Sequence, residues 1–326
     1  MESINEIRWG IIGCGDVCEM KSGPAFNKVG NSKLVAVMRR DAEKAKDYAI
    51  RNHVPKFYDD ANKLIADKDI NALYIATPPA FHEMYAVASM KAGKPVYIEK
   101  PVTLNGQSCE KIIEASRRYQ VSASVAHYRR GLPIFKKIKA LVEEGAIGKV
   151  RLIRVNTLQA PTDKIHAVDN WRINPKISGG GLFFDLAPHQ LDICYWIFGR
   201  PKQVQGFSLN QSHQYQAPDL TTLEAIFGNG VCLHGVWAFN VSAASEEETC
   251  EIIGDKGKIT FAFFRKSNID IRTSTGTERI VFDYPENIQQ PMIDEVVKFF
   301  RGEGTNPCSL EDALVSMKMM NSVSPS

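Results

Sequence analysis

The stretch "IRWGIIGCGDVC", which covers residues 7–18, decides the fold. A mostly apolar run, typical of a buried strand, leads directly into a turn that contains two glycines separated by one residue. In a dinucleotide-binding unit, the first such glycine permits the tight turn, and the second lets the backbone approach a pyrophosphate at the start of a helix. The pattern therefore predicts a dinucleotide site at Gly13, Gly15, Asp16 and Val17.

The third position of the same fingerprint holds Cys18, where glycine or alanine is usual. A cysteine side chain is small enough for close packing of helix on sheet, so the fingerprint tolerates it. The motif alone is a weak signal, and an ordinary strand–turn–helix bend is the competing interpretation. The dinucleotide interpretation is favoured because the motif opens a series of alternating strands and helices.

This alternation extends over the first part of the chain. The apolar runs typical of buried strands lie at residues 33–38, 72–77, 95–100 and 121–126. The amphipathic helical patterns between them cover residues 41–52, 80–93 and 106–120, and Gly93 suits the position just after a helix. Alternation of this kind predicts a doubly wound parallel sheet with helices on both faces. We therefore expect an α/β Rossmann domain over residues 1–124.

The second part of the chain has a different rhythm. After a helical pattern at residues 133–148, the predicted strands follow one another at residues 149–159, 221–227, 231–239, 249–254 and 258–264. The sequence Gly228-Asn229-Gly230 predicts a hairpin turn. Helical patterns at residues 186–199 and 311–320 complete the region. We expect an α+β domain over residues 125–326, with a large, mainly antiparallel sheet backed by a few helices.

Composition excludes several classes of function. The chain has 326 residues, 44% of them hydrophobic and 24% charged, as in ordinary soluble proteins. A net charge of +3 is too small to indicate a nucleic-acid surface, and no apolar run is long enough to cross a membrane. The seven cysteines form no CxxC pair, and Cys14 and Cys18 have no matching pair to hold a metal. We expect a cytoplasmic protein with reduced thiols, no metal, and no nucleic-acid or membrane partner.

Two arginines follow the second predicted strand. About 20 residues beyond the glycines, a dinucleotide site for NAD usually has an acid that accepts the ribose hydroxyls. Arg39 and Arg40 occupy that place here. A guanidinium can hydrogen-bond the 2′-phosphate of NADP, so the pair favours NADP over NAD, with dual use left open. The competing interpretation is a solvated basic loop before a helix that Asp41 caps.

Three later segments carry a resemblance to a known family. They are "ATPPAFH" at residues 76–82, "YIEKPVTLN" at residues 97–105, and "GGGLFFDLAPHQLD" at residues 179–192, which follows a Trp-Arg pair. In this order and spacing, over essentially the whole chain, they resemble the glucose-fructose oxidoreductase, inositol dehydrogenase and MocA family. The resemblance implies a two-domain NAD(P)-dependent oxidoreductase acting on sugars, cyclitols or related carbonyl compounds. It also implies that the second domain, residues 125–326, binds the substrate, and that the open face of its sheet forms a homo-oligomer, either a dimer or a tetramer.

The resemblance further implies roles for individual residues. Lys100 corresponds to the lysine between nicotinamide and substrate, where an ammonium would stabilise negative charge on the substrate oxygen. Asp185 and His189 match the family's D-x-x-x-H pair, with the histidine as general acid/base. From the residues alone, Asp185 could instead be a helix N-cap.

The remaining matches fall into two groups. The residues expected on the cofactor side are Thr77, Pro78, His82, Glu99 and Lys100. The residues expected to face the substrate are Tyr128, Arg129, Trp171 and Arg172. Aromatic rings stack on sugars, and arginine hydrogen-bonds hydroxyls or carboxylates. For His82 a structural place in the first turn of a helix is the alternative, and Trp171 could equally belong to the core.

The sequence thus predicts an NADP-preferring oxidoreductase that transfers hydride to or from a CH–OH or carbonyl carbon in an interdomain cleft. Two other functions stay open. One is redox-neutral chemistry on a retained nicotinamide, either glycoside cleavage or sugar–sugar exchange, as in some members of the family. The other is a cofactor-binding sensor without turnover. The sequence names neither the substrate nor the physiological direction of the reaction.

Overall fold

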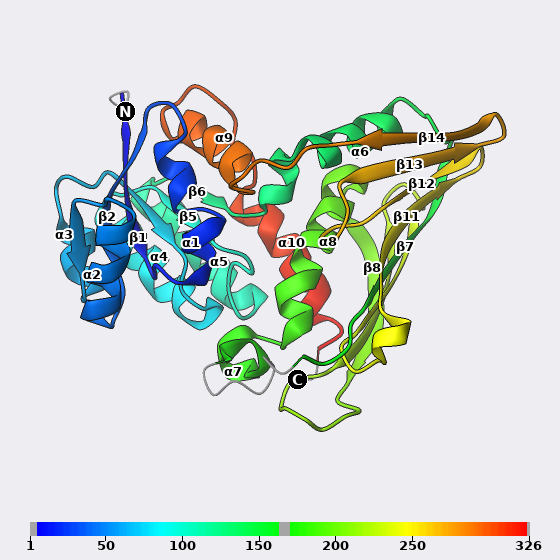
Figure 1. Cartoon of the computed structure of the whole chain (residues 1–326), viewed down its shortest axis with the longest axis horizontal. Coiled ribbons are helices and arrows are strands. Elements are labelled where there is room, and N and C mark those ends of the chain that lie inside the picture. Colours follow the sequence, from blue (N-terminus) through cyan, green and yellow to red (C-terminus); the bar gives the residue numbers. More distant parts are fainter. Residues whose placement is uncertain (1–4, 163–169, 325–326) are drawn as a thin grey trace. The chain divides into compact units, whose positions relative to one another are not determined.

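The computed structural model describes residues 5–162 and 170–324. The chain divides into two compact units (Figure 1). The first unit contains residues 1–131 and 285–314, and the second contains residues 132–284 and 315–326. The second unit is therefore not the continuous segment from residue 125 that the sequence predicted, because residues 285–314 pack with the Rossmann part of the chain. Each unit is described by itself below.

The first unit is built on a six-stranded parallel sheet of order β3-β2-β1-β4-β5-β6. Its strands are β1 (Ile7–Ile12), β2 (Ser32–Met38), β3 (Lys56–Tyr58), β4 (Ala72–Ile75), β5 (Val96–Ile98) and β6 (Ala123–Val125). The strand order reverses between β1 and β4, and sheets of this kind bind ligands outside the carboxyl ends of the strands at that point. The doubly wound parallel sheet expected from the sequence is confirmed.

Helices cover both faces of this sheet (Figure 1). They are α1 (Asp16–Met20), α2 (Ala42–Arg51), α3 (Ala61–Ala66), α4 (His82–Lys91), α5 (Gly106–Tyr119) and α9 (Gln290–Phe300). The carboxylate of Asp41 accepts from the backbone of Lys44 and caps α2, as expected. Gly93, with φ +74°, follows the end of α4 in the expected left-handed conformation.

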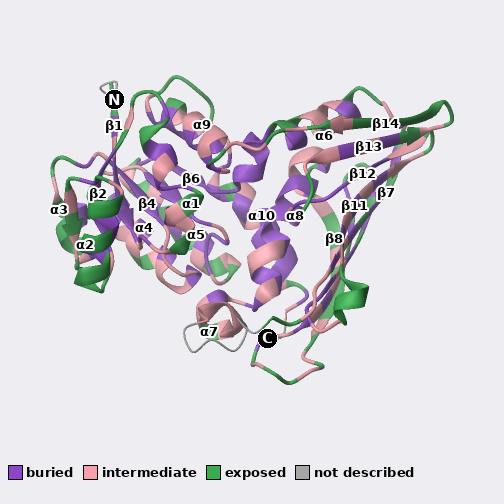
Figure 2. Ribbon diagram, in the orientation of Figure 1, coloured by how far each residue is buried: buried purple, intermediate pink, exposed green. Residues whose placement is uncertain are grey.

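An aromatic cluster fills one face of the sheet. Trp9 of β1 packs against Phe26 of the short helix η1 (Pro24–Asn27) at 4.9 Å between ring centroids, and against Phe300 of α9 at 5.7 Å. Tyr74 of β4 stacks on Tyr97 of β5 at 5.3 Å. All of these strand residues are fully buried, as the purple strand interior in Figure 2 shows. This face of the parallel sheet is therefore covered in part by α9, which comes late in the sequence.

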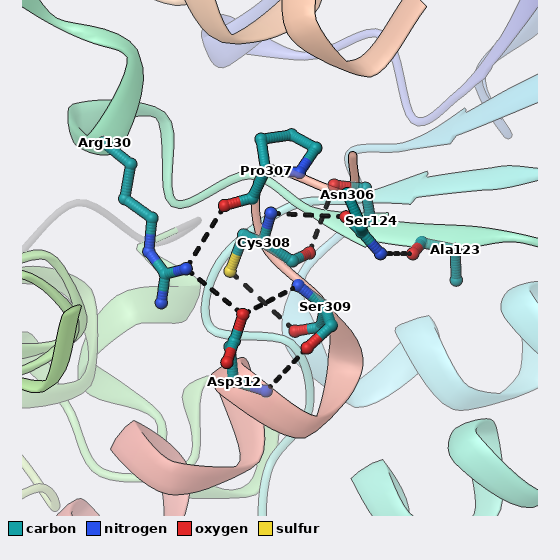
Figure 3. A network of polar contacts seen from close by, with 8 residues as sticks. All are labelled: Ala123, Ser124, Arg130, Asn306, Pro307, Cys308, Ser309 and Asp312. Atoms are coloured by element: carbon teal, nitrogen blue, oxygen red, sulfur yellow. Dashed lines mark hydrogen bonds and ion pairs between the residues drawn. The ribbon is translucent and has the colours of Figure 1, made fainter. Parts of the chain in front are cut away.

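Residues 285–314, called the returning segment below, are also hydrogen-bonded to β6 at the edge of this sheet. The amide of Val125 in β6 donates to the carbonyl of Cys308 at 3.0 Å, and the side-chain amide of Asn306 donates to the carbonyl of Ala123 at 2.8 Å. Arg130, which is buried, hydrogen-bonds the carboxylate of Asp312 at 3.2 Å (Figure 3). Residues 285–314 are thus held to the first unit by hydrogen bonds as well as by apolar packing.

The second unit contains an eight-stranded sheet of order β14-β13-β12-β11-β7-β10-β9-β8. Its strands are β7 (Val150–Leu158), β8 (Pro201–Leu209), β9 (Leu220–Phe227), β10 (Cys232–Ala238), β11 (Glu247–Gly254), β12 (Gly257–Phe261), β13 (Asn268–Thr273) and β14 (Gly276–Val281). All neighbours pair antiparallel except β7 and β10. The predicted hairpin turn joins β9 to β10, and the amide of Gly230 donates to the carbonyl of Phe227.

The helices of this region are α6 (Pro133–Glu143), α7 (Pro175–Ser178) and α8 (Leu182–Phe198), and α10 (Leu310–Asn321) has residues in both units. α8 covers one face of the sheet, where Gln190 accepts from the indole of Trp237 at 2.6 Å and donates to Thr157 at 2.8 Å. The strands carry exposed side chains on the other face, among them Phe207, Glu224 and Ile226. The expected open-faced sheet is confirmed. Over the described residues, no helix has the length and apolarity to cross a membrane.

Candidate functional site

The glycine turn after β1 requires glycine at position 13. Gly13 has φ +92°, and a Cβ atom there would lie 2.9 Å from the backbone nitrogen of Thr77. Its own amide donates to the carbonyl of Met38, the last residue of β2, at 2.9 Å. The turn is therefore held between the carboxyl ends of β2 and β4, and no other residue fits at this position.

Gly15 differs from Gly13, because the fold itself does not require it. It precedes α1 with φ −101°, and the nearest atom to an added Cβ is the carbonyl oxygen of Gly13 at 4.0 Å. The space at this point is therefore open, and the approach of a pyrophosphate to the backbone here stays a prediction. Asp16 and Val17, the first residues of α1, are exposed and half-buried respectively. Cys18 is fully buried, in keeping with the small side chain that close helix packing needs.

Arg39 and Arg40 lie beside this turn. Nη1 of Arg39 is 3.5 Å from the carbonyl oxygen of Cys14, inside the turn. The exposed guanidinium of Arg40 lies 5.3 Å from the ring centroid of Phe81, in the segment after β4. The next acid, Asp41, is engaged in capping α2, and its hydrogen bond from the amide of Lys44 lowers the pKa of its carboxyl. Arg39 thus borders the glycine turn, and Arg40 lies against the segment that follows β4.

His82 at the start of α4 joins two loops. Its Nε2 atom lies 2.6 Å from the carbonyl oxygen of Thr77, and its Nδ1 atom lies 3.2 Å from that of Val102. The side chain is fully buried, and burial lowers the pKa of the imidazole. Both ring nitrogens face protein carbonyls, so the imidazole joins the segments after β4 and β5, and its contact with a cofactor stays a prediction. Among the described residues, the buried hydroxyl of Thr77 finds no hydrogen-bond partner.

The lowered pKa of His82 predicts a pH dependence of stability. Its folded pKa lies below the unfolded value of 6.5, so the unfolded chain takes up more protons as the pH falls through that value. The wild type should therefore lose more free energy of unfolding than His82→Gln between neutrality and about pH 5. Urea unfolding at a series of pH values measures this difference. If the free energy of unfolding of the two proteins changed with pH in parallel, the lowered pKa of His82 would be contradicted.

Glu99 and Lys100 follow β5, where the ligand side of the sheet lies. The carboxylate of Glu99 is 5% exposed and accepts from the Nε2 atom of Gln289 at 2.7 Å, from the hydroxyl of Tyr74, and from the backbone amide of Lys100 at 3.1 Å. Lys100 itself is half-buried. The sequence predicted that Glu99 binds cofactor, whereas the structure surrounds its carboxylate with protein donors. Sequence reasoning missed Gln289, because its partner lies 190 residues away.

In the second unit, α8 carries the D-x-x-x-H pair. Gly181 is the N-cap of this helix, so Asp185 is not the cap and lies inside the first turns. The spacing of four residues places Asp185 and His189 on the same face of α8. His189 is 4% exposed, and its ring packs edge-on against Phe264 at 5.8 Å between centroids. The spacing predicted from the sequence is thus realised on one helix.

The predicted Trp-Arg pair meets this helix. Nε of Arg172 lies 3.2 Å from Oδ2 of Asp185, and its guanidinium carbon lies 4.7 Å from the ring centroid of Trp171. The side chain of Asn170 accepts from the amide of Arg172 and starts the short helix that holds both residues. Trp171 is half-buried, so it is not a core residue. Three predicted site residues therefore form one chain of contacts in the second unit.

Tyr128 and Arg129, the other residues expected to face the substrate, belong to the first unit. Both are buried, at 4% and 6% exposure, and the guanidinium of Arg129 lies 5.4 Å from the ring centroid of Tyr128. They lie in a short helix, Tyr128–Gly131, directly after β6. Their contact with a substrate stays a prediction.

Comparison with known proteins is consistent with this geometry. Residues 7–127 match the model of an oxidoreductase family with an NAD-binding Rossmann fold, and residues 135–260 match the C-terminal domain of the same GFO/IDH/MocA group. Over 323 residues the chain is 42% identical to Oxidoreductase P35 of Formosa agariphila, with 98% of each chain covered. It is 23% identical to the 1,5-anhydro-D-fructose reductase of Ensifer adhaerens over 322 residues, which cover 95% of this chain and 93% of that protein.

Among solved structures, levoglucosan dehydrogenase in complex with NADH superimposes with a TM-score of 0.89. The sequence identity is 20%, and the match covers 98% of this chain and 96% of that one, so it demonstrates a shared fold. Together, the two family models span most of the chain, and they cover the six-stranded sheet of the first unit and strands β7 to β11 of the second. The chain belongs to the glucose-fructose oxidoreductase, inositol dehydrogenase and MocA family of oxidoreductases, whose N-terminal domain is an NAD-binding Rossmann fold.

Proposed function

We propose that this protein is an NADP-preferring oxidoreductase that transfers hydride to or from a CH–OH or carbonyl carbon of a sugar, a cyclitol or a related compound. The observation that carries the proposal is the glycine turn with the guanidinium of Arg39 3.5 Å from one of its carbonyls, in a chain that also has Lys100 after β5. A sugar-like substrate is supported by relatives named for sugar derivatives, 1,5-anhydro-D-fructose reductase and levoglucosan dehydrogenase.

The preference for NADP rests on charge at the adenosine end of the site. NAD-specific sites use an acid to accept the ribose hydroxyls, and an acid there would repel a 2′-phosphate. Here the corresponding place holds Arg39, followed by Arg40. Guanidinium groups form paired, charge-assisted hydrogen bonds with phosphate, which favours the phosphorylated cofactor.

Arg39→Asp should reverse this preference. We expect the dissociation constant for NADPH to rise by more than about tenfold, because a favourable contact with phosphate becomes a repulsive one, while NADH binding changes little. Titration of each variant with both reduced cofactors measures the effect. Lys46→Asp, the same charge change at an exposed position of α2, serves as the control. Tighter binding of NADH than NADPH by the wild type, unaffected by Arg39→Asp, would overturn the NADP preference.

The proposed chemistry assigns three residues to the reacting atoms. A bound nicotinamide supplies the carbon that accepts or donates hydride. The ammonium of Lys100 would hydrogen-bond the substrate oxygen and stabilise negative charge on it. The imidazole of His189 would take or return the hydroxyl proton, since histidine ordinarily titrates near neutrality. Asp185 would orient His189 and a substrate hydroxyl. Tyr128, Arg129, Trp171 and Arg172 would contact the rest of the substrate.

The substrate can be found by ligand-induced stabilisation. A panel of sugars, cyclitols and sugar acids, added with NADP⁺ or NADPH, should contain compounds that raise the melting temperature, because a ligand that binds only the native state stabilises it by mass action. Hits are then assayed for turnover. Turnover that releases NADPH supports a dehydrogenase. Turnover without free NADPH would favour redox-neutral chemistry, and binding without any turnover would favour a sensor.

We also expect a cytoplasmic homo-oligomer, either a dimer or a tetramer. The exposed apolar side chains on the open sheet face, which include Phe207, Leu209 and Ile226, support an oligomer. The seven cysteines, all of which are free thiols, support a cytoplasmic location. Sedimentation velocity measures the mass in solution, and a monomer at all concentrations would contradict the expectation.

A further inference from the structure

Gln289 occupies a helix position that usually carries a capping side chain, yet it does not cap. It is the N-cap residue of α9, and its side chain makes no hydrogen bond to the first turn of that helix. N-cap positions favour short polar residues whose oxygen accepts from the helix backbone. Gln289 is instead fully buried, with its side-chain amide donating to Glu99 at 2.7 Å. Its side chain therefore binds the loop after β5 and does not cap its own helix.

Glu99 links Gln289 to the backbone of Lys100. One carboxylate oxygen of Glu99 accepts from Gln289 and from the hydroxyl of Tyr74, and the other accepts from the backbone amide of Lys100 at 3.1 Å. A carboxylate that is 5% exposed needs such donors, because burying a charge without hydrogen bonds is costly. Gln289 and the backbone of Lys100 are thus bound to opposite oxygens of one buried group.

The backbone around Gln289 reaches the helix that follows the glycine turn. The amide of Gln289 donates to the carbonyl of Lys21 at 3.2 Å, and the side chain of Asn287 donates to the carbonyl of Met20 at 2.7 Å. These carbonyls end α1, where a helix has no donors of its own. One short segment, residues 287–289, therefore contacts both the glycine-turn helix and the glutamate next to Lys100.

We propose that Gln289 is a positioning residue for Lys100, and that it fixes the lysine relative to the glycine turn through Glu99. The inference rests on the proposed function of Lys100, and it extends that function to a residue distant in sequence. The side chain of Gln289 hydrogen-bonds Glu99, and its backbone amide hydrogen-bonds the end of α1. The loop after β5 and the helix after the glycine turn are therefore both bound to this one residue. No motif in the sequence identifies this residue.

Hydrogen exchange tests the link without reference to any substrate. In Gln289→Met, which keeps a long side chain but removes the amide, the backbone amide of Lys100 should exchange about tenfold faster or more, because Glu99 loses a donor and no longer holds that amide firmly. The matched control is Asn306→Ala. Asn306 lies in the same returning segment, where it donates to the carbonyl of Ala123 in β6 and accepts from the backbone amide of Cys308, and neither bond involves Glu99 or Lys100 (Figure 3). Unchanged exchange at Lys100 in Gln289→Met would overturn the inference.

A kinetic cycle tests the consequence for hydride transfer, with a hit from the ligand panel as substrate. Gln289→Met should slow single-turnover hydride transfer by about ten- to a hundredfold, because a misplaced catalytic group loses much of its effect. NADPH affinity should hold, since the contact with α1 is made by the backbone. On a Lys100→Met background the same change should have no further effect. Asn306→Ala should lower the melting temperature and leave the rate unchanged.

Tyr74→Phe provides a second route if Gln289→Met folds poorly. It removes the other side-chain donor to Glu99 while the ring can remain stacked on Tyr97. It should speed exchange at Lys100 and slow hydride transfer in the same way. Equal slowing of the rate with and without Lys100 would overturn the positioning role. If Lys100→Met alone leaves the rate unchanged while exchange responds to Gln289→Met, the proposed function of Lys100 fails and the physical link remains.

Discussion

Lys100→Met is expected to slow hydride transfer by about 10²–10³-fold, the typical cost of removing one group that stabilises charge on a reacting oxygen. NADPH affinity should stay within about twofold of the wild type, because the proposed contact is with the substrate oxygen and not with the adenosine half. Lys100 is half-buried directly after β5, at the carboxyl end of a parallel strand, where such sheets bind their ligands. Single-turnover kinetics and a NADPH fluorescence titration measure the two quantities separately.

Lys91→Met is the control for this change. It removes the same charge from an exposed position at the end of α4 and should leave both rate and affinity unchanged. Activity of Lys100→Met close to the wild type would remove Lys100 from the mechanism. A large loss of NADPH affinity would instead indicate that Lys100 acts by holding the cofactor.

Gly15→Val should lower NADPH affinity by more than about tenfold without destabilising the protein. The backbone at Gly15 is extended, and an added Cβ would have no atom closer than 4.0 Å, so the folded chain accepts a side chain there. The side chain would fill the space through which a pyrophosphate approaches the turn. Isothermal titration with NADPH and thermal unfolding without cofactor give the two readouts.

Substitutions at two other glycines provide comparisons for Gly15→Val. Gly30→Val is the neutral control, because an added Cβ there meets no atom within 4 Å and the residue is far from the turn in sequence. Gly13→Ala should lose stability as well as affinity, since φ +92° and a contact of 2.9 Å with Thr77 both oppose a side chain. If Gly15→Val bound NADPH as tightly as the wild type, the glycine turn would not be the pyrophosphate site.

The sequence predicted the architecture of both units because their strands and helices carry clear periodicities. It missed β3, which has three residues, and α3, which has six, because elements this short carry little pattern. It also missed β8, most of whose residues are exposed and follow no regular alternation of apolar and polar side chains. The helical spacing of Met292, Val296 and Phe300 in α9 could have been recognised. That this helix packs on the first unit could not, because the contact joins segments almost the whole chain apart.

The candidate site shows the same limit. The glycine turn, the two arginines and the D-x-x-x-H pair are local patterns, so their spacing was sufficient to find them. His82 and Glu99 are different, because what their polar atoms do depends on distant partners. The imidazole of His82 contacts the carbonyl of Val102, and the carboxylate of Glu99 contacts Gln289. A sequence motif identifies such residues as special without showing whether they contact a ligand or hold a loop.

The release of NADPH distinguishes a dehydrogenase from the two other functions. Purified wild type is mixed with NADP⁺ and each sugar, cyclitol or sugar acid that stabilises it, and the near-ultraviolet absorbance of NADPH is followed. We expect NADPH to form with at least one compound, faster than NADH forms when NAD⁺ replaces NADP⁺. We expect this activity to be lost in Lys100→Met and His189→Gln. Product formation without free reduced cofactor, or equal turnover in Lys100→Met, would contradict the proposed function.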